Sequence, residues 1–358
     1  MTTTRDVARL AGVSVATVSA VINKNKFVSS ELAQRVEGAI AELGYRPNLL
    51  ARSLKSGRSR TIGVIIPNIR DPYWSEIVAA VEGTARADGY SILLCDTQEN
   101  PSVERRSLDL LAESKVDGII VVPTGVENEP RIASLVDEGI SVVLVSRRLP
   151  TLDLDAVITD YEMAGYLAAH HLIETGYRRV AIIVYPPFAS SGADKLRGYQ
   201  RAMMEAGLLL DPTLVREGQF PPEESGFREM ERLLQHPEGR PDAVVACTHL
   251  LVMGILRSLR DHHLAAPDDL GLVAFDEYPW TPYMRPALTV VQQQRSQMGV
   301  VAARRLIARI GGDLREPGRT ISVSSELIVR ESSGVCPKDS GTNPESAGQR
   351  VGLRMGPA

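Results

Sequence analysis

The sequence has few cysteines, few aromatic residues and no long apolar run. Its three cysteines, Cys95, Cys247 and Cys336, are odd in number and far apart, so they fit neither a disulfide framework nor a metal cluster. No apolar segment is long enough to cross a bilayer, and the residues after Met1 do not have the pattern of a signal peptide. We therefore predict a cytoplasmic protein with free thiols, no metal site and no membrane partner.

Sequence motifs of enzyme chemistry are also missing. We find no glycine-rich phosphate loop after the first predicted strand, no nucleophile elbow and no zinc-ligand spacing. His170 and His171 are adjacent, as are His262 and His263, and adjacent residues do not share one face of a helix. We therefore predict that the protein is not an enzyme and needs no cofactor.

Charge is distributed unevenly along the chain. With 358 residues, 44% of them apolar and 5% aromatic, the chain has the composition of a soluble globular protein and is long enough for several domains. Residues 1–60 carry ten Lys and Arg against four Asp and Glu, whereas the remaining 298 residues carry 30 basic and 40 acidic side chains. A small basic segment on a large acidic body indicates a polyanionic partner for that segment.

The pattern of residues 4–23 is that of a helix-turn-helix. Thr4 is placed to cap a first helix, Gly12 to supply a left-handed turn and Ser14 to cap a second helix. Three apolar residues recur at helical spacing and should face inward: Val18, Val21 and Ile22. The side chains left on or near the exposed face are short and suit base edges and thymine methyl groups in a major groove: Val15, Ala16, Thr17, Ser19, Ala20 and Asn23. An ordinary helical hairpin is the alternative. A third helix should follow at residues 30–43.

A short segment after this module begins at Pro47, which can open a helix, and ends at Gly57, which can close one. The residues between them are too few for a stable helix in water. Leu50 and Leu54 form an apolar pair with nothing nearby in the sequence to cover it. The segment is therefore either a frayed linker or a helix that folds only against a partner and DNA, with a leucine wedge in the minor groove.

Three stretches of this region match a known pattern: Val7-Ala-Arg-Leu-Ala-Gly-Val-Ser-Val-Ala-Thr-Val-Ser19, Gly44-Tyr-Arg-Pro-Asn48 and Ala51-Arg-Ser-Leu-Lys55. They resemble the LacI/GalR family of bacterial repressors, in the style of its purine-repressor-like branch. The resemblance implies a headpiece, a hinge helix and a core like that of sugar-binding proteins. It implies that Thr17, Ser19 and Asn23 contact DNA from the recognition helix, and that Ala51, Leu54 and Lys55 lie in the minor groove. Ala20 stands where the family usually has Arg or His.

From Thr61 onward, short apolar runs alternate with amphipathic stretches. Buried strands are expected at 62–66, 91–95, 118–122, 141–145, 179–184, 243–247 and 271–275, and helices at 73–88, 102–114 and 131–139. This alternation predicts parallel sheets that helices cover on both faces. Two such series predict an α/β core of two doubly wound parallel-sheet lobes, which the resemblance identifies as periplasmic-binding-protein-like, behind an all-α helix-turn-helix headpiece. A ligand should bind at the strand ends between the lobes.

Polar and aromatic side chains follow several of these strands. The first strand is followed by Tyr73 and Trp74, the fourth by Ser146 and Arg147, and later strands by residues 189–195, Phe220, Thr248-His249 and Asp276. Rings stack on the apolar face of a sugar or base, and charged groups fix hydroxyls or charge. The resemblance places ligand contacts at Tyr73, Trp74, Ser146, Ser191, Lys195, Phe220 and Asp276, and His249 is a further candidate.

Three of these positions depart from the common choices of the family. Lys195 stands in place of Arg, Ser146 in place of Asp, and Thr248-His249 in place of Asn-Asp. A lysine is a point charge where an arginine would offer a bidentate fork. Together the departures favour a more anionic effector over a simple hexose.

We therefore predict a repressor that binds a two-fold symmetric double-stranded DNA operator as a homodimer and is controlled by a small-molecule effector. A solute-binding protein without a regulatory role is the alternative. The predicted domains are a headpiece at 1–46, a hinge helix and linker at 47–60, an effector-binding core at 61–332 and a disordered tail at 333–358. The first lobe should comprise about 61–160 and 291–320, and the second about 161–290 and 321–332. The tail lacks the leucine heptads of a tetramer-forming coiled coil, so we expect a dimer only.

Overall fold

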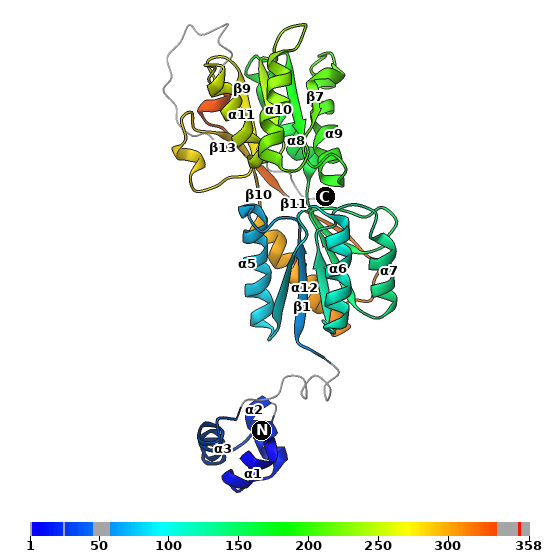
Figure 1. Cartoon of the computed structure of the whole chain (residues 1–358), viewed down its shortest axis with the longest axis vertical. Coiled ribbons are helices and arrows are strands. Elements are labelled where there is room, and N and C mark those ends of the chain that lie inside the picture. Colours follow the sequence, from blue (N-terminus) through cyan, green and yellow to red (C-terminus); the bar gives the residue numbers. More distant parts are fainter. Residues whose placement is uncertain (1, 24–25, 46–57, 335–349, 352–358) are drawn as a thin grey trace. The chain divides into compact units, whose positions relative to one another are not determined.

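The computed structural model describes residues 2–23, 26–45, 58–334 and 350–351. The chain divides into two compact units, residues 1–60 and 61–358, which are drawn in Figure 1. Residues 47–57 of the predicted hinge helix and linker (47–60) and most of the predicted tail lie outside the described residues. None of the described helices is long and apolar enough to cross a membrane.

Three helices form the first unit: α1 (Thr4–Ala11), α2 (Val15–Asn23) and α3 (Ser30–Glu42). Thr3, and not Thr4 as predicted, is the N-cap of α1, because only Thr3 has an acidic residue, Asp6, at the position needed for a capping box. The Thr4 hydroxyl instead forms a 2.8 Å hydrogen bond with the Tyr45 hydroxyl. Gly12 has the predicted left-handed conformation, with φ of 62°.

The core of this unit confirms the helix-turn-helix pattern. The Ser14 hydroxyl accepts a 3.0 Å hydrogen bond from the Thr17 N–H and so caps α2. The buried residues that hold the helices together are Val7, Ala8, Ala11, Val18, Val36 and Ala39, with Val21 and Ile22 packed against them. The Arg35 guanidinium of α3 donates a 2.7 Å hydrogen bond to the Ala11 carbonyl at the end of α1. The turn between α1 and α2 is therefore held by the Ser14 cap and by the hydrogen bond from Arg35 of α3.

In the second unit, the first lobe is a six-stranded parallel sheet in the order β11-β5-β4-β3-β1-β2. Its strands are β1 (Thr61–Ile66), β2 (Ser91–Asp96), β3 (Gly118–Val121), β4 (Ser141–Val145), β5 (Asp155–Thr159) and β11 (Thr320–Val323). Helices α5 (Pro72–Ala87) and α12 (Arg295–Gly311) cover one face of the sheet, and α6 (Pro101–Glu113) and α7 (Glu129–Asp137) cover the other.

The second lobe is a seven-stranded sheet in the order β13-β12-β10-β9-β8-β6-β7, in which only β12 runs antiparallel to its neighbours. Its strands are β6 (Val180–Val184), β7 (Val215–Glu217), β8 (Ala243–Ala246), β9 (Gly271–Phe275), β10 (Thr289–Gln293), β12 (Ser325–Ile328) and β13 (Arg350–Val351). Helices α8 (Tyr161–Glu174) and α9 (Ser190–Glu205) pack on one face, and α10 (Pro222–Leu234) and α11 (His249–Asp261) on the other. Three short 3₁₀ turns complete the lobe: η1 (Pro212–Leu214), η2 (Thr281–Tyr283) and η3 (Glu331–Ser333).

Helices α8 and α9 approach each other at glycines. A Cβ atom on Gly198 would lie 1.9 Å from the Glu162 carbonyl oxygen, and one on Gly165 would lie 2.1 Å from the Lys195 carbonyl oxygen. Only glycine permits this distance between the two backbones. The backbone of Lys195 is thereby fixed against α8.

The chain crosses between the lobes between β5 and α8, between β10 and α12 and between β11 and β12. The last two crossings come about three residues later than predicted, because β10 ends at Gln293 in the second sheet and β11 runs to Val323 in the first. Ordered chain also continues past residue 332. The buried Ser333 hydroxyl forms a 2.6 Å hydrogen bond with the Thr289 hydroxyl, and the Gly334 carbonyl accepts one from Tyr177.

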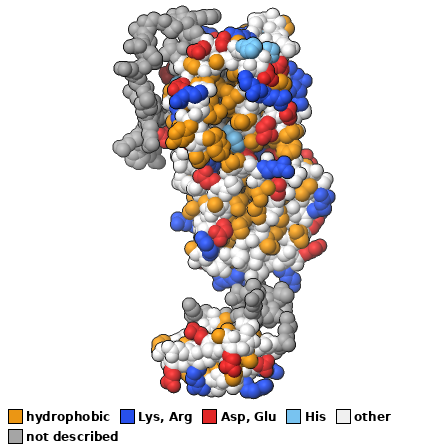
Figure 2. All heavy atoms as spheres, turned by 60° about the vertical axis from the view of Figure 1, so that its left-hand side comes forward, with side chains coloured by type: hydrophobic (Ala, Val, Ile, Leu, Met, Phe, Trp, Pro, Cys, Tyr) orange, Lys and Arg blue, Asp and Glu red, His pale blue; other side chains and the backbone are white. Residues whose placement is uncertain are grey.

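Apolar side chains remain exposed on both lobes. Leu93 and Leu94 lie on the edge strand β2 and are 43% and 38% exposed. On the second lobe, Met253 of α11, Trp280 and Tyr283 are also exposed, Tyr283 to 82%. Figure 2 shows one face of the molecule on which hydrophobic side chains gather over both lobes. Exposed apolar side chains that gather on one face often mark an interaction site.

Candidate functional site

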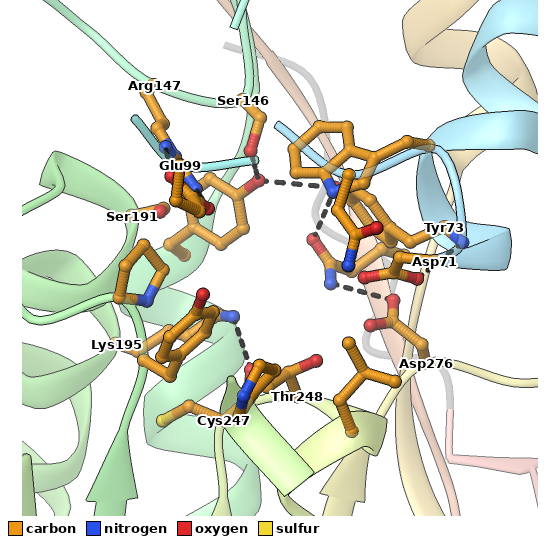
Figure 3. A pocket seen from close by; sticks show the side chains of 18 residues that line it. Asp71, Tyr73, Glu99, Ser146, Arg147, Ser191, Lys195, Cys247, Thr248 and Asp276 are labelled. Carbon is orange, nitrogen blue, oxygen red and sulfur yellow. Dashed lines mark hydrogen bonds and ion pairs between the residues drawn. The ribbon is translucent and has the colours of Figure 1, made fainter. Parts of the chain in front are cut away.

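A cavity lies between the two lobes, at the carboxyl ends of the strands, as the sequence predicts (Figure 3). The empty space between its walls is about 540 Å³, which includes space open to solvent. Six predicted effector contacts line it: Tyr73, Trp74, Ser146, Ser191, Lys195 and Asp276. Both lobes therefore contribute to one site.

Two of these residues follow their strands in the same unusual conformation. Ser146 comes directly after β4 with φ of 65°, and Asp276 directly after β9 with φ of 76°. The N–H of Ser146 donates to the Val157 carbonyl at 2.8 Å, and that of Asp276 donates to the Val291 carbonyl at 3.0 Å. Left-handed backbone at residues other than glycine is uncommon and occurs often at functional sites. Here it turns each side chain from the end of its strand into the cavity.

A continuous chain of hydrogen bonds joins these two strand ends. The Gln293 amide nitrogen donates to Asp276 Oδ1 at 2.8 Å, and the Tyr73 hydroxyl donates to Gln293 Oε1 at 3.2 Å. The Tyr73 hydroxyl lies 3.3 Å from the Tyr161 hydroxyl, which lies 2.6 Å from the Ser146 hydroxyl. Since Asp276 and Gln293 belong to the second lobe and Tyr73 and Ser146 to the first, the chain connects the lobes through the site.

Two buried carboxyl groups lie on one side of the cavity. Asp71 caps α5, accepting a 2.8 Å hydrogen bond from the Tyr73 N–H, and Asp276 lies 3.8 Å from an Arg295 nitrogen. Burial raises the pKa of Asp71 to about 7, and the nearby Asp276 contributes in the same direction. Burial likewise raises the pKa of Asp276 to about 6, although Arg295 and Lys195 oppose it. Both groups are suited to accept hydrogen bonds from ligand hydroxyls.

Lys195 enters the cavity from α9. Its ammonium donates a 2.8 Å hydrogen bond to the Cys247 carbonyl and lies 4.3 Å from the centre of the Phe275 ring and 5.2 Å from that of Tyr161. Burial lowers the pKa of this ammonium. In the described part of the chain, no carboxylate lies within ion-pair distance of it.

Arg147, by contrast, is already neutralised. Its guanidinium forms a buried ion pair with Glu99 at 2.6 Å and donates to the Pro123 carbonyl at 2.9 Å. Arg147 and Glu99 both line the cavity. The pair fixes the wall of the first lobe.

Two predicted contacts do not line the cavity. Phe220 is 52% exposed, because the segment before α10 places Pro222 on the cavity wall instead. His249 is the first residue of α11, and its ring packs against Tyr278, whose hydroxyl lies 3.0 Å from His249 Nδ1. His249 Nε2 also lies 3.7 Å from Asp71 Oδ1, but burial lowers the pKa of this histidine to about 4. His249 therefore meets Asp71 across the lobes as a neutral ring.

Twelve lining residues were not among the predicted contacts: Asn68, Asp71, Glu99, Arg147, Tyr161, Tyr185, Pro186, Pro222, Cys247, Thr248, Leu250 and Gln293. Asn68 and Asp71 lie between β1 and Tyr73, so the expectation that a ligand binds at the strand ends points to them as well. Tyr161 and Gln293 lie at lobe crossings, and only knowledge of those crossings would have found them.

The predicted DNA-reading helix α2 presents part of the expected surface. Val15 and Ala16 are exposed, and Thr17 and Ser19 are half-buried. Ala20 was expected on this face but is only 8% exposed, because other parts of the unit cover it. The Asn23 side chain and the predicted minor-groove residues Ala51, Leu54 and Lys55 lie outside the described residues.

Replacing Asp71 with asparagine should stabilise the protein more at about pH 8 than at about pH 5. Asparagine can still cap α5. In the folded protein the pKa of Asp71 is about 7, above its ordinary 3.8, so the wild type loses stability as pH rises through this window, whereas the variant does not. The measurement is the melting temperature of both proteins at each pH. An equal difference at the two pH values would contradict the prediction.

Together, a helix-turn-helix unit and a two-lobed core with a polar cavity between its lobes define a ligand-responsive DNA-binding regulator. Comparison with known families agrees: residues 3–48 match the bacterial regulatory proteins of the lacI family, and residues 59–331 match the periplasmic binding proteins and sugar binding domain of the LacI family. The chain belongs to the LacI family. The match to the headpiece sets aside the alternative of a solute-binding protein without a regulatory role.

Similar proteins span nearly the whole chain. The HTH-type transcriptional repressor PurR of Histophilus somni is 33% identical over 332 residues, which are 93% of this chain and 99% of that protein. PurR of Actinobacillus pleuropneumoniae is 35% identical over 335 residues, 93% and 98% of the two chains. The solved complex of the transcriptional regulator CelR with cellobiose is 32% identical, covers 93% of this chain and 100% of its own, and has a TM-score of 0.71. The Lac repressor dimer bound to operator and an anti-inducer, 24% identical over 93% and 99% of the chains with a TM-score of 0.81, shares the fold.

Proposed function

We propose that this protein is a transcriptional repressor that binds a two-fold symmetric operator as a homodimer and whose DNA affinity changes when a small molecule binds between the lobes. It acts in the cytoplasm, where its DNA is, and catalyses no reaction. The observation that carries the proposal is the hydrogen-bond chain from Ser146 to Asp276, because it runs along the cavity and joins both lobes.

A ligand that contacts both walls of this cavity favours the arrangement of lobes in which both walls reach it. Trp74 offers a ring for stacking, Asp276 accepts hydrogen bonds from hydroxyls, and Lys195 meets a negative group. On the DNA side, Thr17, Ser19 and Asn23 contact bases in the major groove, and Leu54 is the minor-groove wedge, with Ala51 and Lys55 beside it. The similarity to PurR and to the CelR–cellobiose complex supports both halves of this proposal.

Exposed apolar surface supports the homodimer. An edge strand with two neighbouring exposed leucines invites pairing unless another surface covers it, and Leu93 and Leu94 form such an edge. Trp280 and Tyr283 add aromatic surface on the other lobe, of the kind enriched in protein interfaces. A second copy would cover both regions. The two-fold symmetry of that pair would then impose a symmetric operator.

Selection of bound sequences from random duplex DNA, followed by footprinting, tests the proposal. We expect a two-fold symmetric consensus, protection of two half-sites, and much weaker binding to one half-site alone. Leu54→Ala should weaken binding to this operator by on the order of 1–3 kcal/mol and leave effector binding intact. Full affinity for a single asymmetric half-site, or no DNA binding at all, would overturn the proposed function.

A further inference from the structure

The charge on the cavity walls is divided between two sides. In Figure 3, Asp71 and Asp276 lie together on one side, whereas Lys195 and Ser191 lie on the other. Both carboxyl groups and the ammonium are more than nine-tenths buried. A ligand in this cavity therefore meets hydrogen-bond acceptors at one end and a cation at the other.

Among the described residues, Lys195 has no carboxylate at ion-pair distance, and Asp276 and Asp71 favour its charge only from farther away. Arg147 is paired with Glu99 at 2.6 Å. The carboxylate nearest to Lys195 along α9, that of Asp194, is occupied by Arg148 at 2.8 Å and by Arg197. Lys195 has a backbone carbonyl and two aromatic rings around it, which stabilise an ammonium far less than a carboxylate does. A buried charge without a counterion is costly unless a ligand supplies one.

Two helices begin at the wall of the cavity. Helix α9 begins at Ser190 and α11 at His249, and neither has a side-chain cap hydrogen bond. Ser191 of α9 and Thr248 and Leu250 at the start of α11 line the cavity. Helix N-termini carry a partial positive charge and free N–H donors, and so attract anions. They add to the charge of Lys195 and do not oppose it.

We propose that the effector is a small polyhydroxy compound with an anionic group, which lies against Lys195 and the starts of α9 and α11 while its hydroxyls donate to Asp71 and Asp276. This rests on the proposed function only in taking the cavity as the effector site. A neutral sugar of the same size would leave Lys195 without a counterion, whereas a purely anionic compound without hydroxyls would leave the two carboxyl groups without donors.

Matched pairs of compounds test this proposal: glucuronate against glucose, galacturonate against galactose, gluconate against sorbitol, and glucose 6-phosphate against glucose. Thermal shift identifies the compounds that bind, and calorimetry then gives the affinity of each pair. The anionic member of at least one pair should bind about tenfold or more tightly than its neutral partner. The phosphate and carboxylate pairs show which anion the site takes.

Lys195→Met tests the residue itself. The variant should bind the anionic and neutral members of that pair with equal affinity, and its effector-free form should melt at a higher temperature than wild type because a buried charge is removed. Lys195→Arg should retain the preference for the anion. The proposal is overturned if the neutral partner binds as tightly as the acid, if Lys195→Met keeps the preference, or if no anionic compound raises the melting temperature.

Operator binding by the same samples without any compound separates this proposal from the proposed function. A protein that binds its operator but prefers neutral sugars contradicts only the effector class. A protein that prefers the acids but does not bind DNA contradicts only the regulatory function.

Discussion

Replacing Asp276 with alanine should abolish the effector's influence on DNA binding and leave the operator affinity of the effector-free protein close to that of wild type. Asp276 is 4% exposed and is the acceptor at the second-lobe end of the hydrogen-bond chain. Hydrogen bonds to charged groups contribute about 1.5–3 kcal/mol each, so the loss of two should lower the affinity for the effector by on the order of 10²-fold or more. The headpiece is a separate compact unit and keeps its own core.

The measurement is a band-shift titration of the operator with and without the effector. Asp137→Ala, which removes an exposed carboxylate at the end of α7, serves as the matched control and should respond like wild type. A ligand shifts an equilibrium between two forms only by its differential affinity for them. An Asp276→Ala protein with a full effector response would therefore place the site elsewhere.

The hydrogen-bond chain explains why loss of one acceptor should remove the response and not merely weaken binding. Gln293 donates to Asp276 and accepts from Tyr73, so it orients the carboxyl of one lobe from the hydroxyl of the other. Gln293 is also the last residue of β10, directly before the crossing into α12. A ligand that bonds to Asp276 thus acts on a group that both lobes hold, at the point where the chain passes between them.

Much of this site could be predicted because parallel strands end at one edge of a sheet. That rule pointed to the segments that hold six lining residues, Ser146 and Asp276 among them, and the family resemblance then singled out the individual positions. It could not decide the direction of each side chain beyond a strand end, and Phe220 and His249 do not line the cavity. Nor could it find Tyr161, which reaches the cavity only because the chain crosses between the lobes just before α8.

In the headpiece, too, the sequence predicted the helices and the turn but not every local contact. Helical spacing predicted the inward face of α2 correctly at Val18, and Gly12 has the predicted left-handed turn. The capping residue was displaced by one position, since Thr3 and Asp6 together form a box that Thr4 cannot form. The burial of Ala20 depends on tertiary contacts, which helical spacing does not describe.

Disrupting the proposed dimer should have the largest effect on operator binding. The double variant Leu94→Asp and Tyr283→Asp puts a carboxylate into the exposed apolar surface of each lobe. A charge buried at an interface without a partner is strongly unfavourable, so the protein should become monomeric. A monomer binds one half-site only. In a dimer, binding of the first headpiece holds the second at a high effective concentration near the other half-site, and a monomer lacks this gain. Its operator affinity should therefore fall by about 10²–10⁴-fold.

Analytical ultracentrifugation gives the oligomeric state of the variant, band shift its operator affinity and thermal shift its effector binding. Effector binding should persist, because neither Leu94 nor Tyr283 lines the cavity. Leu209→Asp is the matched control: Leu209 is 87% exposed in the loop after α9, so the same change there should leave a dimer with wild-type operator affinity. A double variant that stays dimeric would show that other surfaces join the two copies. A monomer with undiminished operator affinity would show that one headpiece suffices.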